Sequence, residues 1–341
     1  MSYGVTRILS YEQLGLAISD ILFWIKPSSK DHEARQAILK ALQHTLRLMG
    51  YKDAKVEPFG SFLYNLYTKN ADLDISVDIP SSIDSSANVL GHIRRILLQR
   101  NLPILNFVPE ARIPLLTFQS IHWNVTCDVT IKNHLGEIKS KFLLWISKID
   151  KRFGDMVLLV KEWAKANDIN NPKEGTFNSY ALCLLVIFHL QTCMPAILPP
   201  LKEIYAGTIN VNSSTKLTEE RRIQHVCATN IEKFLSRRAV NRSTLPQLVV
   251  SFFEKFSQFN VMAGNHVIST YSGKWEDKRN CRWMAQKTDK VLIEDPLQLS
   301  DNTARTVRKR HLTKISQAFG NTYNSFWHVS PSRSYYHSCL R

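Results

Sequence analysis

Residues 59–79 read FGSFLYNLYTKNADLDISVDI, and this stretch decides the fold that we expect. In its second half every other residue is apolar, which predicts a strand with one face in a core, formed by Leu73, Ile75, Val77 and Ile79. Asp72 and Asp74 fall on the other face of the same strand. Gly60 and Ser61 precede them, and a Gly-Ser pair lets backbone and a hydroxyl approach a phosphate closely.

A second stretch, NVTCDVTI at 124–131, has the same alternation and places Asp128 on its polar face. If the two strands are neighbours, Asp128 converges with Asp72 and Asp74. Three crowded carboxylates repel unless a cation lies among them, and hard oxygen ligands suit Mg²⁺ or Mn²⁺. An isolated Asp-x-Asp is more often an ordinary wet strand face. The upstream Gly-Ser pair and the third aspartate favour a two-metal site for displacement at phosphorus.

Strand-like and helix-like stretches alternate around these motifs, which predicts a mixed α/β domain over residues 50–140. Helical spacing dominates afterwards and predicts a helical domain over 141–325. We expect residues 1–49 to form an N-terminal helical segment that packs on the helical domain, and residues 326–341 to form a tail. The predicted strands lie at 56–61, 72–79, 111–120 and 123–131, and the predicted helices at 33–49, 88–100, 142–149, 155–167, 179–190 and 245–259.

The chain has 341 residues, 44% of them apolar, and a formal net charge of +15. Such an excess disfavours a compact state by self-repulsion, so it indicates an anionic partner, nucleic acid first and a membrane surface second. The cysteines have no zinc-ligand spacing and indicate reduced thiols in an intracellular protein. The most apolar stretch, 179–194, is interrupted by His189 and Gln191, so we expect a buried helix and no membrane span.

The pattern Gly60-Ser61, Asp72-Leu73-Asp74 and Asp128 resembles the terminal RNA nucleotidyltransferases, which include uridylyltransferases and poly(A) polymerases. LLVKEWAKANDIN, GTFNSYALCLLVIFHLQ and LIEDPLQLSDNTARTV resemble motifs of their helical domain, so the resemblance covers about residues 55–315. The run from Thr176 to Leu201 resembles plant members that uridylate small RNAs lacking a 3′-terminal methyl group. The resemblance implies an α/β nucleotidyltransferase domain with a mixed β-sheet, a mostly helical poly(A)-polymerase-associated domain, and an active site in the cleft between them.

The resemblance also assigns roles. It implies that Asp72, Asp74 and Asp128 hold Mg²⁺ or Mn²⁺ and that Asp128 also activates the RNA 3′-hydroxyl. It places the ribose contact at Asn133 and the triphosphate contacts at Lys161 and Lys165. It places a phosphate contact at Ser179, base stacking at Tyr180, and Asp295 in the base-reading motif. With the Gly-Ser pair, the expected nucleotide-binding residues are Gly60, Ser61, Asn133, Lys161, Lys165, Ser179, Tyr180, Asp295 and Gln298.

The same residues have simpler interpretations. Lys161 and Lys165 are four apart on one helix face, and such a pair is commonly just solvated. Tyr180 has the chemistry to stack on a base, but alone it is more typical of a half-buried tyrosine. Ser179 is also a candidate N-cap of its helix. Asp295 lies before a proline and fits an acidic turn as well as a base contact.

The base-reading run departs from the family pattern, which commonly reads IEDPF followed by an acid. Here Leu297 replaces the aromatic residue and Gln298 the acid, and Asp301 stands where some uridine-preferring relatives have histidine. An amide still offers an acceptor to uracil. These changes bear on the choice between UTP and ATP and leave the metal-binding residues untouched.

We therefore expect a template-independent RNA 3′-terminal uridylyltransferase that uses UTP on small RNAs or cleavage fragments and promotes their decay. The alternatives are adenylyl transfer from ATP, an RNA-binding relative without catalysis, and nucleotide transfer to a small molecule or protein. The expected partners are RNA 3′ ends and the nucleotide, with an Argonaute protein implied by resemblance alone and no membrane. We expect a monomer in the cytoplasm, the nucleus or both.

Overall fold

The computed structural model describes residues 9–79, 85–111, 113–207, 209, 215–280, 283 and 290–341. The chain divides into two compact units. The sheet unit comprises Ile25–Lys148 and Ile209–Ala228, and the helical unit comprises Met1–Trp24, Ile149–Thr208 and Thr229–Arg341. Cys281, counted among the cysteines above, lies outside the described residues.

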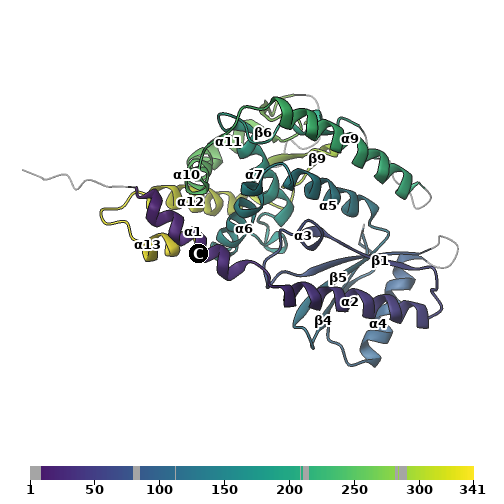
Figure 1. The fold of residues 1–341 in the computed structure, drawn as a ribbon. Coiled ribbons are helices and arrows are strands. Elements are labelled where there is room, and N and C mark those ends of the chain that lie inside the picture. Colours follow the sequence, from purple (N-terminus) through teal and green to yellow (C-terminus); the bar gives the residue numbers. More distant parts are fainter. Residues whose placement is uncertain are drawn as a thin grey trace, which may run out of the picture. The chain divides into compact units, whose positions relative to one another are not determined.

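A five-stranded sheet of order β1-β2-β5-β4-β3 forms the centre of the sheet unit. Only β2 and β5 pair in parallel within this sheet as described, and the other pairs are antiparallel. In Figure 1, helices α2 and α4 lie below this sheet and α5 lies above it. The bounds are β1 Lys55–Phe59, β2 Leu73–Asp78, β3 Ile104–Val108, β4 Leu115–Ser120, β5 Val125–Ile131, α2 Ser29–Leu48, α3 Gly60–Leu63, α4 Ser86–Gln99 and α5 His134–Ser147.

The core of the sheet unit lies between the sheet and helices α2 and α4. Leu73, Ile75 and Val77 of β2 are fully buried and belong to the same apolar cluster as Ile38 of α2 and Leu97 of α4. The predicted apolar face of β2 is therefore confirmed. Burying one such side chain contributes about 1.5–3 kcal/mol, so this face holds the strand in a fixed register.

The predicted strands and helices of this unit are present, most with boundaries shifted by a few residues. The helix predicted at 142–149 is α5, which begins eight residues earlier, at His134, and belongs to the sheet unit. β3 was not predicted, because its five residues, ILNFV, are mostly apolar without alternation and follow a proline. The carboxylate face of the sheet is less exposed to solvent than we expected. Ser76, on the carboxylate side of β2, is only 1% exposed because α5 covers it.

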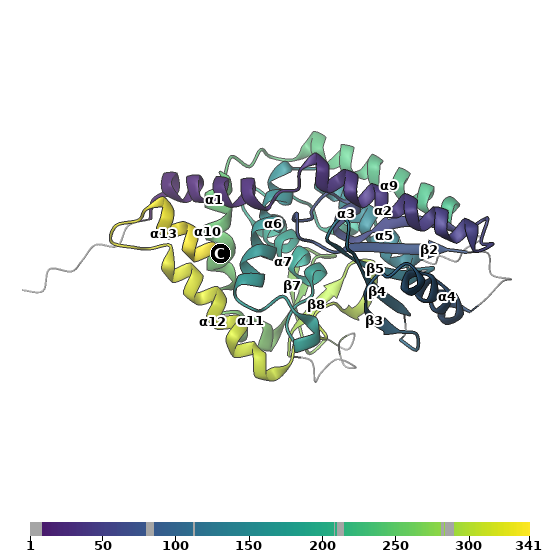
Figure 2. The ribbon, with the colours of Figure 1, turned by 90° about the horizontal axis from the view of Figure 1, so that it is seen from below.

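Helices make up most of the helical unit, and Figure 2 shows them from below. They are α1 Tyr11–Ile25, α6 Lys151–Ala166, η1 Pro172–Glu174, α7 Ser179–Thr192, α8 Leu201–Ile204, α9 Lys216–Arg237, α10 Leu245–Phe256, α11 Phe259–Asn265, α12 Lys309–Ser325 and α13 Arg333–Leu340, of which α1 and α9 extend into the sheet unit. A four-stranded sheet of order β7-β6-β8-β9 was not predicted, because its strands are short; they are β6 His266–Ser269, β7 Lys274–Asp277, β8 Leu292–Asp295 and β9 Gln298–Asn302.

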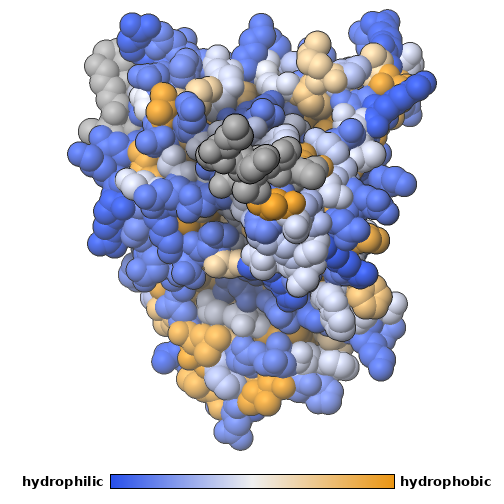
Figure 3. All heavy atoms as spheres, turned by 90° about the vertical axis from the view of Figure 1, so that its left-hand side faces the viewer, coloured by the Kyte–Doolittle hydropathy of each residue, from blue (hydrophilic) through white to orange (hydrophobic). Residues whose placement is uncertain are grey.

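Helix α7 is apolar on all sides, and its residues from Ala181 to Gln191 are buried. Such a helix is the centre of a globular core rather than an amphipathic surface element. Within the described part of the chain, no helix combines the length and apolar character that a membrane crossing needs. The surface that faces the left of Figure 1 is mostly hydrophilic with separate apolar patches (Figure 3).

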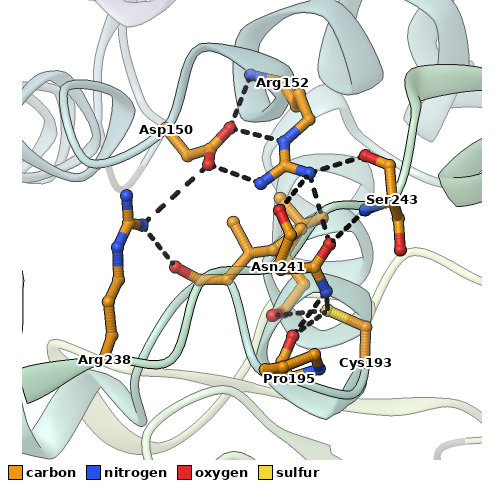
Figure 4. Close-up of polar contacts among 9 residues, drawn as sticks. Asp150, Arg152, Cys193, Pro195, Arg238, Asn241 and Ser243 are labelled. Carbon is orange, nitrogen blue, oxygen red and sulfur yellow. Dashed lines mark hydrogen bonds and ion pairs between the residues drawn. The ribbon is translucent and has the colours of Figure 1, made fainter.

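A polar network fixes the start of α6 to two loops of the helical unit (Figure 4). Asp150 caps α6 by accepting a hydrogen bond from the backbone N–H of Arg152, and its carboxylate pairs with the Arg152 guanidinium at 2.7 Å. Arg152 Nη1 also donates to the carbonyl oxygens of Asn241 and Ser243, at 3.1 and 2.7 Å. Burial opposes the Asp150 charge, but the Arg152 contacts outweigh it and lower the Asp150 pKa.

The two ends of the described chain also carry structure. Residues 326–341, expected to be a tail, contain α13, whose Tyr336 is fully buried. The Tyr336 hydroxyl accepts a hydrogen bond from the backbone N–H of Ser10 at 2.9 Å. Of the expected N-terminal helical segment, nearly all of α1 belongs to the helical unit and α2 belongs to the sheet unit.

Candidate active site on the carboxylate face of the sheet

Asp74 and Asp128 lie directly opposite each other. β2 and β5 pair in parallel with Asp74 in register with Asp128, so the predicted neighbourhood of the two strands is confirmed. Adjacent strands are about 4.7–4.9 Å apart, and both side chains leave the sheet on the same face. Asp72 comes one residue before β2 and is exposed, whereas Asp74 and Asp128 are half-buried.

Thr117 fixes the carboxylate of Asp128 from the neighbouring strand. β4 pairs antiparallel with β5, and this register places Thr117 opposite Asp128. The Thr117 hydroxyl donates to Oδ1 of Asp128 at 2.6 Å. Sequence reasoning missed Thr117. The alternation of Leu116, Thr117 and Phe118 was a usable signal, because it puts the threonine on the polar face once β4 is taken as a neighbour of β5.

Gly60 lies against the other carboxylate. β1 ends at Phe59, which is opposite Asp74, and Gly60 follows with φ of +64°. A Cβ on Gly60 would come 2.0 Å from Oδ2 of Asp74. The backbone N–H of Gly60 donates to the hydroxyl of Ser140 on α5 at 2.7 Å. Glycine is therefore required twice here, for its left-handed backbone and for the space that Asp74 fills.

The side chains at this face fit a divalent cation by chemistry and register. Carboxylate oxygens are the ligands that Mg²⁺ and Mn²⁺ prefer, and two of them project from paired positions of adjacent strands. In the described ranges of the chain, no three His, Cys, Asp or Glu side chains are grouped as metal ligands are. Asp74 and Asp128 are the residues that would hold the ion. The third expected ligand, Asp72, precedes β2 and is exposed, and its part in the site stays a prediction.

Asn133 connects α5 to this face of the sheet. Its backbone N–H donates to the hydroxyl of Ser76 at 3.2 Å, two residues along β2 from Asp74. Its side chain caps α5 by accepting from the backbone N–H of Gly136 at 3.1 Å. In the structure Asn133 therefore has a positioning role, while the ribose contact expected for it stays a prediction.

A cluster of buried charges lies farther along the same face and was not predicted. Lys216, at the start of α9, is 6% exposed and reaches Glu137 at 2.6 Å, Glu57 at 3.5 Å and Asp78 at 3.7 Å. Burial disfavours the ammonium, but the carboxylates outweigh it and raise the Lys216 pKa. Burial likewise opposes the Asp78 charge, and the contacts from His134 and Lys216 lower its pKa overall.

The nucleotide contacts expected from α6 and α7 lie in the helical unit. Lys161 is buried and Lys165 is exposed, so they differ in access although they share a helix face. Lys165 lines a cleft of about 490 Å³ together with Asp168, Asn170, Asn171, Glu174, Thr176, His311 and Lys314. The Ser179 hydroxyl lies 3.3 Å from the amide nitrogen of Asn170, a residue that lines the same cleft.

The N-cap of α7 is Asn178, not Ser179. The Asn178 side chain accepts from the backbone N–H of Ala181 at 2.8 Å, so the capping role proposed for Ser179 is wrong by one residue. Ser179 therefore does not cap the helix, and its hydroxyl lies beside Asn170. Tyr180 is half-buried in the second position of the helix.

Asp295 closes a tight turn between two strands. It is 1% exposed, and its Oδ1 accepts from the backbone N–H groups of Leu297 and Gln298 at 3.0 and 3.2 Å. The acidic-turn interpretation therefore describes Asp295 well, and base reading by it stays a prediction. Asp301, on β9, pairs with Arg305 at 3.0 Å.

Comparison with known sequences gives one consistent picture. A family model described as the central palm domain of mitochondrial-like poly(A) RNA polymerase matches residues 14–148. Protein HESO1 of Arabidopsis thaliana is 45% identical over 315 residues, which cover 89% of this chain and 61% of that protein. Terminal uridylyltransferase cid1 of Schizosaccharomyces pombe is 28% identical over 320 residues, covering 86% and 74%.

Poly(A) RNA polymerase cid11 of the same yeast is 24% identical over 303 residues, covering 88% of this chain and 59% of that protein. The chain thus spans about three fifths of the length of HESO1 and cid11. Among solved structures, Cid1 poly(U) polymerase with MgGTP bound matches with a TM-score of 0.78 at 25% identity, covering 97% of this chain and 99% of that one. A cytoplasmic RNA terminal U-transferase matches with a TM-score of 0.77 at the same identity and coverage. The expected nucleotidyltransferase fold with a helical C-terminal part is confirmed.

Proposed function

Because the chain belongs to the terminal RNA nucleotidyltransferase family, we propose that it adds UMP from UTP, without a template, to RNA 3′ ends. The observation that carries the proposal is the register of Asp74 with Asp128 on one face of the sheet. The RNA 3′-oxygen attacks the α-phosphorus of UTP, a phosphodiester bond forms, and pyrophosphate leaves with the electrons of the broken bond.

Each residue of this face has a role in that reaction. Asp74 and Asp128 hold a divalent cation, Mg²⁺ or Mn²⁺, which supplies charge stabilisation to the oxygens of the reacting phosphate. Thr117 positions the Asp128 carboxylate, which also accepts the proton of the RNA 3′-hydroxyl. Gly60 keeps the backbone beside Asp74 free of side-chain bulk, and Ser61 offers a hydroxyl to phosphate.

The helical unit supplies the remaining nucleotide contacts in this proposal. Lys161 and Lys165 bind the triphosphate as point charges. Ser179 binds phosphate and Tyr180 stacks on the base, a contact that contributes about 1–3 kcal/mol. Asp295 shapes the turn that presents Gln298 to the base edge, where the amide offers both an acceptor and donors.

The names of some relatives support UTP over ATP as the substrate. Cid1 is called a terminal uridylyltransferase and covers most of this chain. The second candidate, adenylyl transfer, is supported by relatives such as cid11 that are named poly(A) RNA polymerases. It is kept because Leu297 and Gln298 depart from the common family pattern and Asp301 stands where some uridine-preferring relatives have histidine.

We also propose small RNAs or RNA cleavage fragments as substrates, with decay as the outcome. The support is the 45% identity to HESO1 and the resemblance of residues 176–201 to plant small-RNA uridylyltransferases. An Argonaute protein that presents the RNA, a monomeric state and a cytoplasmic or nuclear location are proposed on the same resemblance. The net charge of +15 fits an RNA partner.

An extension assay tests the activity and the nucleotide together. Purified protein is incubated with a labelled RNA oligonucleotide, Mg²⁺ or Mn²⁺, and each of the four nucleoside triphosphates separately, using RNAs with free and 2′-O-methylated 3′ ends. We expect U addition to the free end and little to the methylated one. Preferential A addition supports the second candidate. A double variant, Asp74→Asn with Asp128→Asn, should abolish extension, and wild-type extension by it would show that the site is elsewhere.

A further inference from the structure

A small apolar pocket opens on the side of the sheet unit opposite the carboxylates. It has a volume of about 140 Å³ and lies among α2, α4 and the β4–β5 hairpin. An apolar cavity of about 150 Å³ is large enough to accept benzene. Its lining includes Ala41, Thr45, Leu97, Arg100, Phe118 and Trp123.

The pocket lies on the far side of the sheet from the proposed active site. Phe118 lines it and is buried in the core with α2 and α4, whereas its neighbour Thr117 points to Asp128 on the other face. Alternate residues of a strand leave opposite faces. Binding at this pocket is therefore separable from the nucleotide chemistry.

Large exposed apolar side chains line the pocket or are close in sequence to its lining residues. Trp123 is 42% exposed and Ile121 is 60% exposed at the hairpin, and Leu48 is 68% exposed one helical turn beyond Thr45. The rings of His122 and Trp123 pack edge to face, with their centroids 4.5 Å apart. Exposed aliphatic and aromatic groups gathered near a cavity are typical of protein–protein contact surfaces.

The segments that supply most of the pocket lining are basic. The segments 36–50, 85–100 and 115–127, which supply most of its lining, contain no Asp or Glu. Their basic residues are all exposed, and they are Lys40, Arg47, Arg94, Arg95 and Arg100. Arg100 also donates from Nη1 to the Thr45 hydroxyl at 2.7 Å, so its guanidinium is held at the rim of the pocket. A basic rim complements an acidic partner.

We propose that this surface binds an acidic segment of a partner protein that inserts one large apolar side chain into the pocket. The inserted side chain contacts Ala41, Leu97 and Trp123, and flanking carboxylates of the segment pair with Lys40, Arg47 and Arg100. Apolar anchors in desolvated pockets dominate binding energy, while the rim charges set the rate and specificity of association.

The test uses the full chain and a defined probe. The probe is a short fluorescein-labelled peptide of Asp and Glu around a central Leu-Trp-Leu, titrated by fluorescence polarisation at low and physiological salt. We expect saturable binding that Ala41→Trp weakens by about tenfold or more, because the new ring fills the pocket. Ala228→Trp, at an exposed position of α9, is the matched control and should bind within about twofold of the wild type.

One further variant and one altered probe keep the proposal open to refutation. A double reversal, Lys40→Glu with Arg47→Glu, should weaken the probe, and a probe with serine in place of its tryptophan should bind weakly to the wild type. Equal binding of both probes to Ala41→Trp and wild type would overturn the proposal, as would no saturable binding. If a single-stranded RNA oligonucleotide displaces the probe and Ala41→Trp weakens that RNA equally, the surface binds RNA instead.

The result is independent of catalysis. The Asp74→Asn, Asp128→Asn variant should bind the peptide as the wild type does, and Ala41→Trp should extend RNA at the wild-type rate. If the wild-type protein extends RNA but does not bind the peptide, only this surface is rejected. If it binds the peptide but does not extend RNA, only the proposed activity is rejected.

Discussion

Gly60 lies where a side chain would displace the carboxylate of Asp74, since a Cβ placed there would lie 2.0 Å from Oδ2. Gly60→Ala should therefore move Asp74 and also strain the backbone at φ +64°, at a cost of about 1–2 kcal/mol. We expect kcat for RNA extension to fall by about a hundredfold, because a displaced catalytic group of this kind is that costly.

The control for Gly60 is Gly91 on α4, where a Cβ would meet nothing within 4 Å. Gly91→Ala should leave extension unchanged and stabilise the helix by a few tenths to about 1 kcal/mol. Thermal unfolding and initial extension rates measure both effects. Wild-type turnover in Gly60→Ala would contradict the placement of the site.

Thr117 acts on the reaction only through Asp128. Thr117→Val keeps the shape and removes the hydroxyl that donates to Oδ1 of Asp128 at 2.6 Å. We expect kcat to fall about tenfold with KM for UTP little changed, because the lost contact matters in the reaction rather than in nucleotide binding. Thr117→Ser should restore most of the rate.

The matched control for Thr117 is Thr126→Val on β5, whose hydroxyl donates to Gln119 and not to a carboxylate. It should keep the wild-type kcat. Equal losses in both valine variants, with no rescue by serine, would mean that Thr117 only supports the strand.

Lys216 neutralises buried carboxylates, so its removal should destabilise the sheet unit. Lys216→Met leaves Glu137, itself 1% exposed, without its ammonium at 2.6 Å. Breaking one side of a buried ion pair costs about 3–5 kcal/mol, and chemical denaturation should show that loss. Adding Glu137→Gln should recover part of the lost stability.

Lys233→Met, at an exposed position of the same helix, should change the free energy of unfolding by less than about 0.5 kcal/mol. If Lys216→Met changes the free energy of unfolding as little, water rather than Lys216 stabilises the charges of the carboxylates. If Glu137→Gln adds to the loss instead of relieving it, the pairing is wrong.

His189 makes the helical unit sensitive to acid. It is 1% exposed on α7, and burial, with Lys255 as a second cause, lowers its pKa from 6.5 to about 3. The unfolded chain therefore binds a proton between these values and the folded chain does not. Stability contributed by neutral His189 is present above pH 6.5 and declines as the pH falls, by at most about 1.4 kcal/mol per pH unit.

A His189→Phe variant should lose less stability between pH 7 and pH 5 than the wild type, whatever its stability at pH 7. Urea unfolding at the two pH values gives the difference directly. An equal pH dependence in both proteins would show that His189 is protonated in the folded state.

The central part of the site could be predicted because strand alternation is a local property. The sequence around Asp74 and Asp128 determines which face each carboxylate takes, and two strands with matching faces favour adjacency. The register that sets Asp74 opposite Asp128 is not local, and neither is the position of Thr117 on a third strand. Those follow only once the whole sheet is assembled.

Other features could not be predicted from the sequence, for different physical reasons. Lys216 is far along the chain from Glu57 and Glu137, and an isolated lysine in a polar stretch is normally solvated. The sheet of the helical unit has strands of only four or five residues, too short for a periodic signal. Asn178 and Ser179 are both good N-caps, and only the backbone shows which one begins the helix.

Helix α9 begins at Lys216 among the residues of the sheet unit and ends at Arg237 among those of the helical unit. Neither unit is therefore a continuous stretch of the gene product. A fragment cut after Lys148 would lack Lys216 and would leave Glu137 and Asp78 exposed to solvent without their cationic partner. Attempts to express the aspartate-bearing half alone should supply the 209–228 segment in trans or by circular rearrangement of the coding sequence.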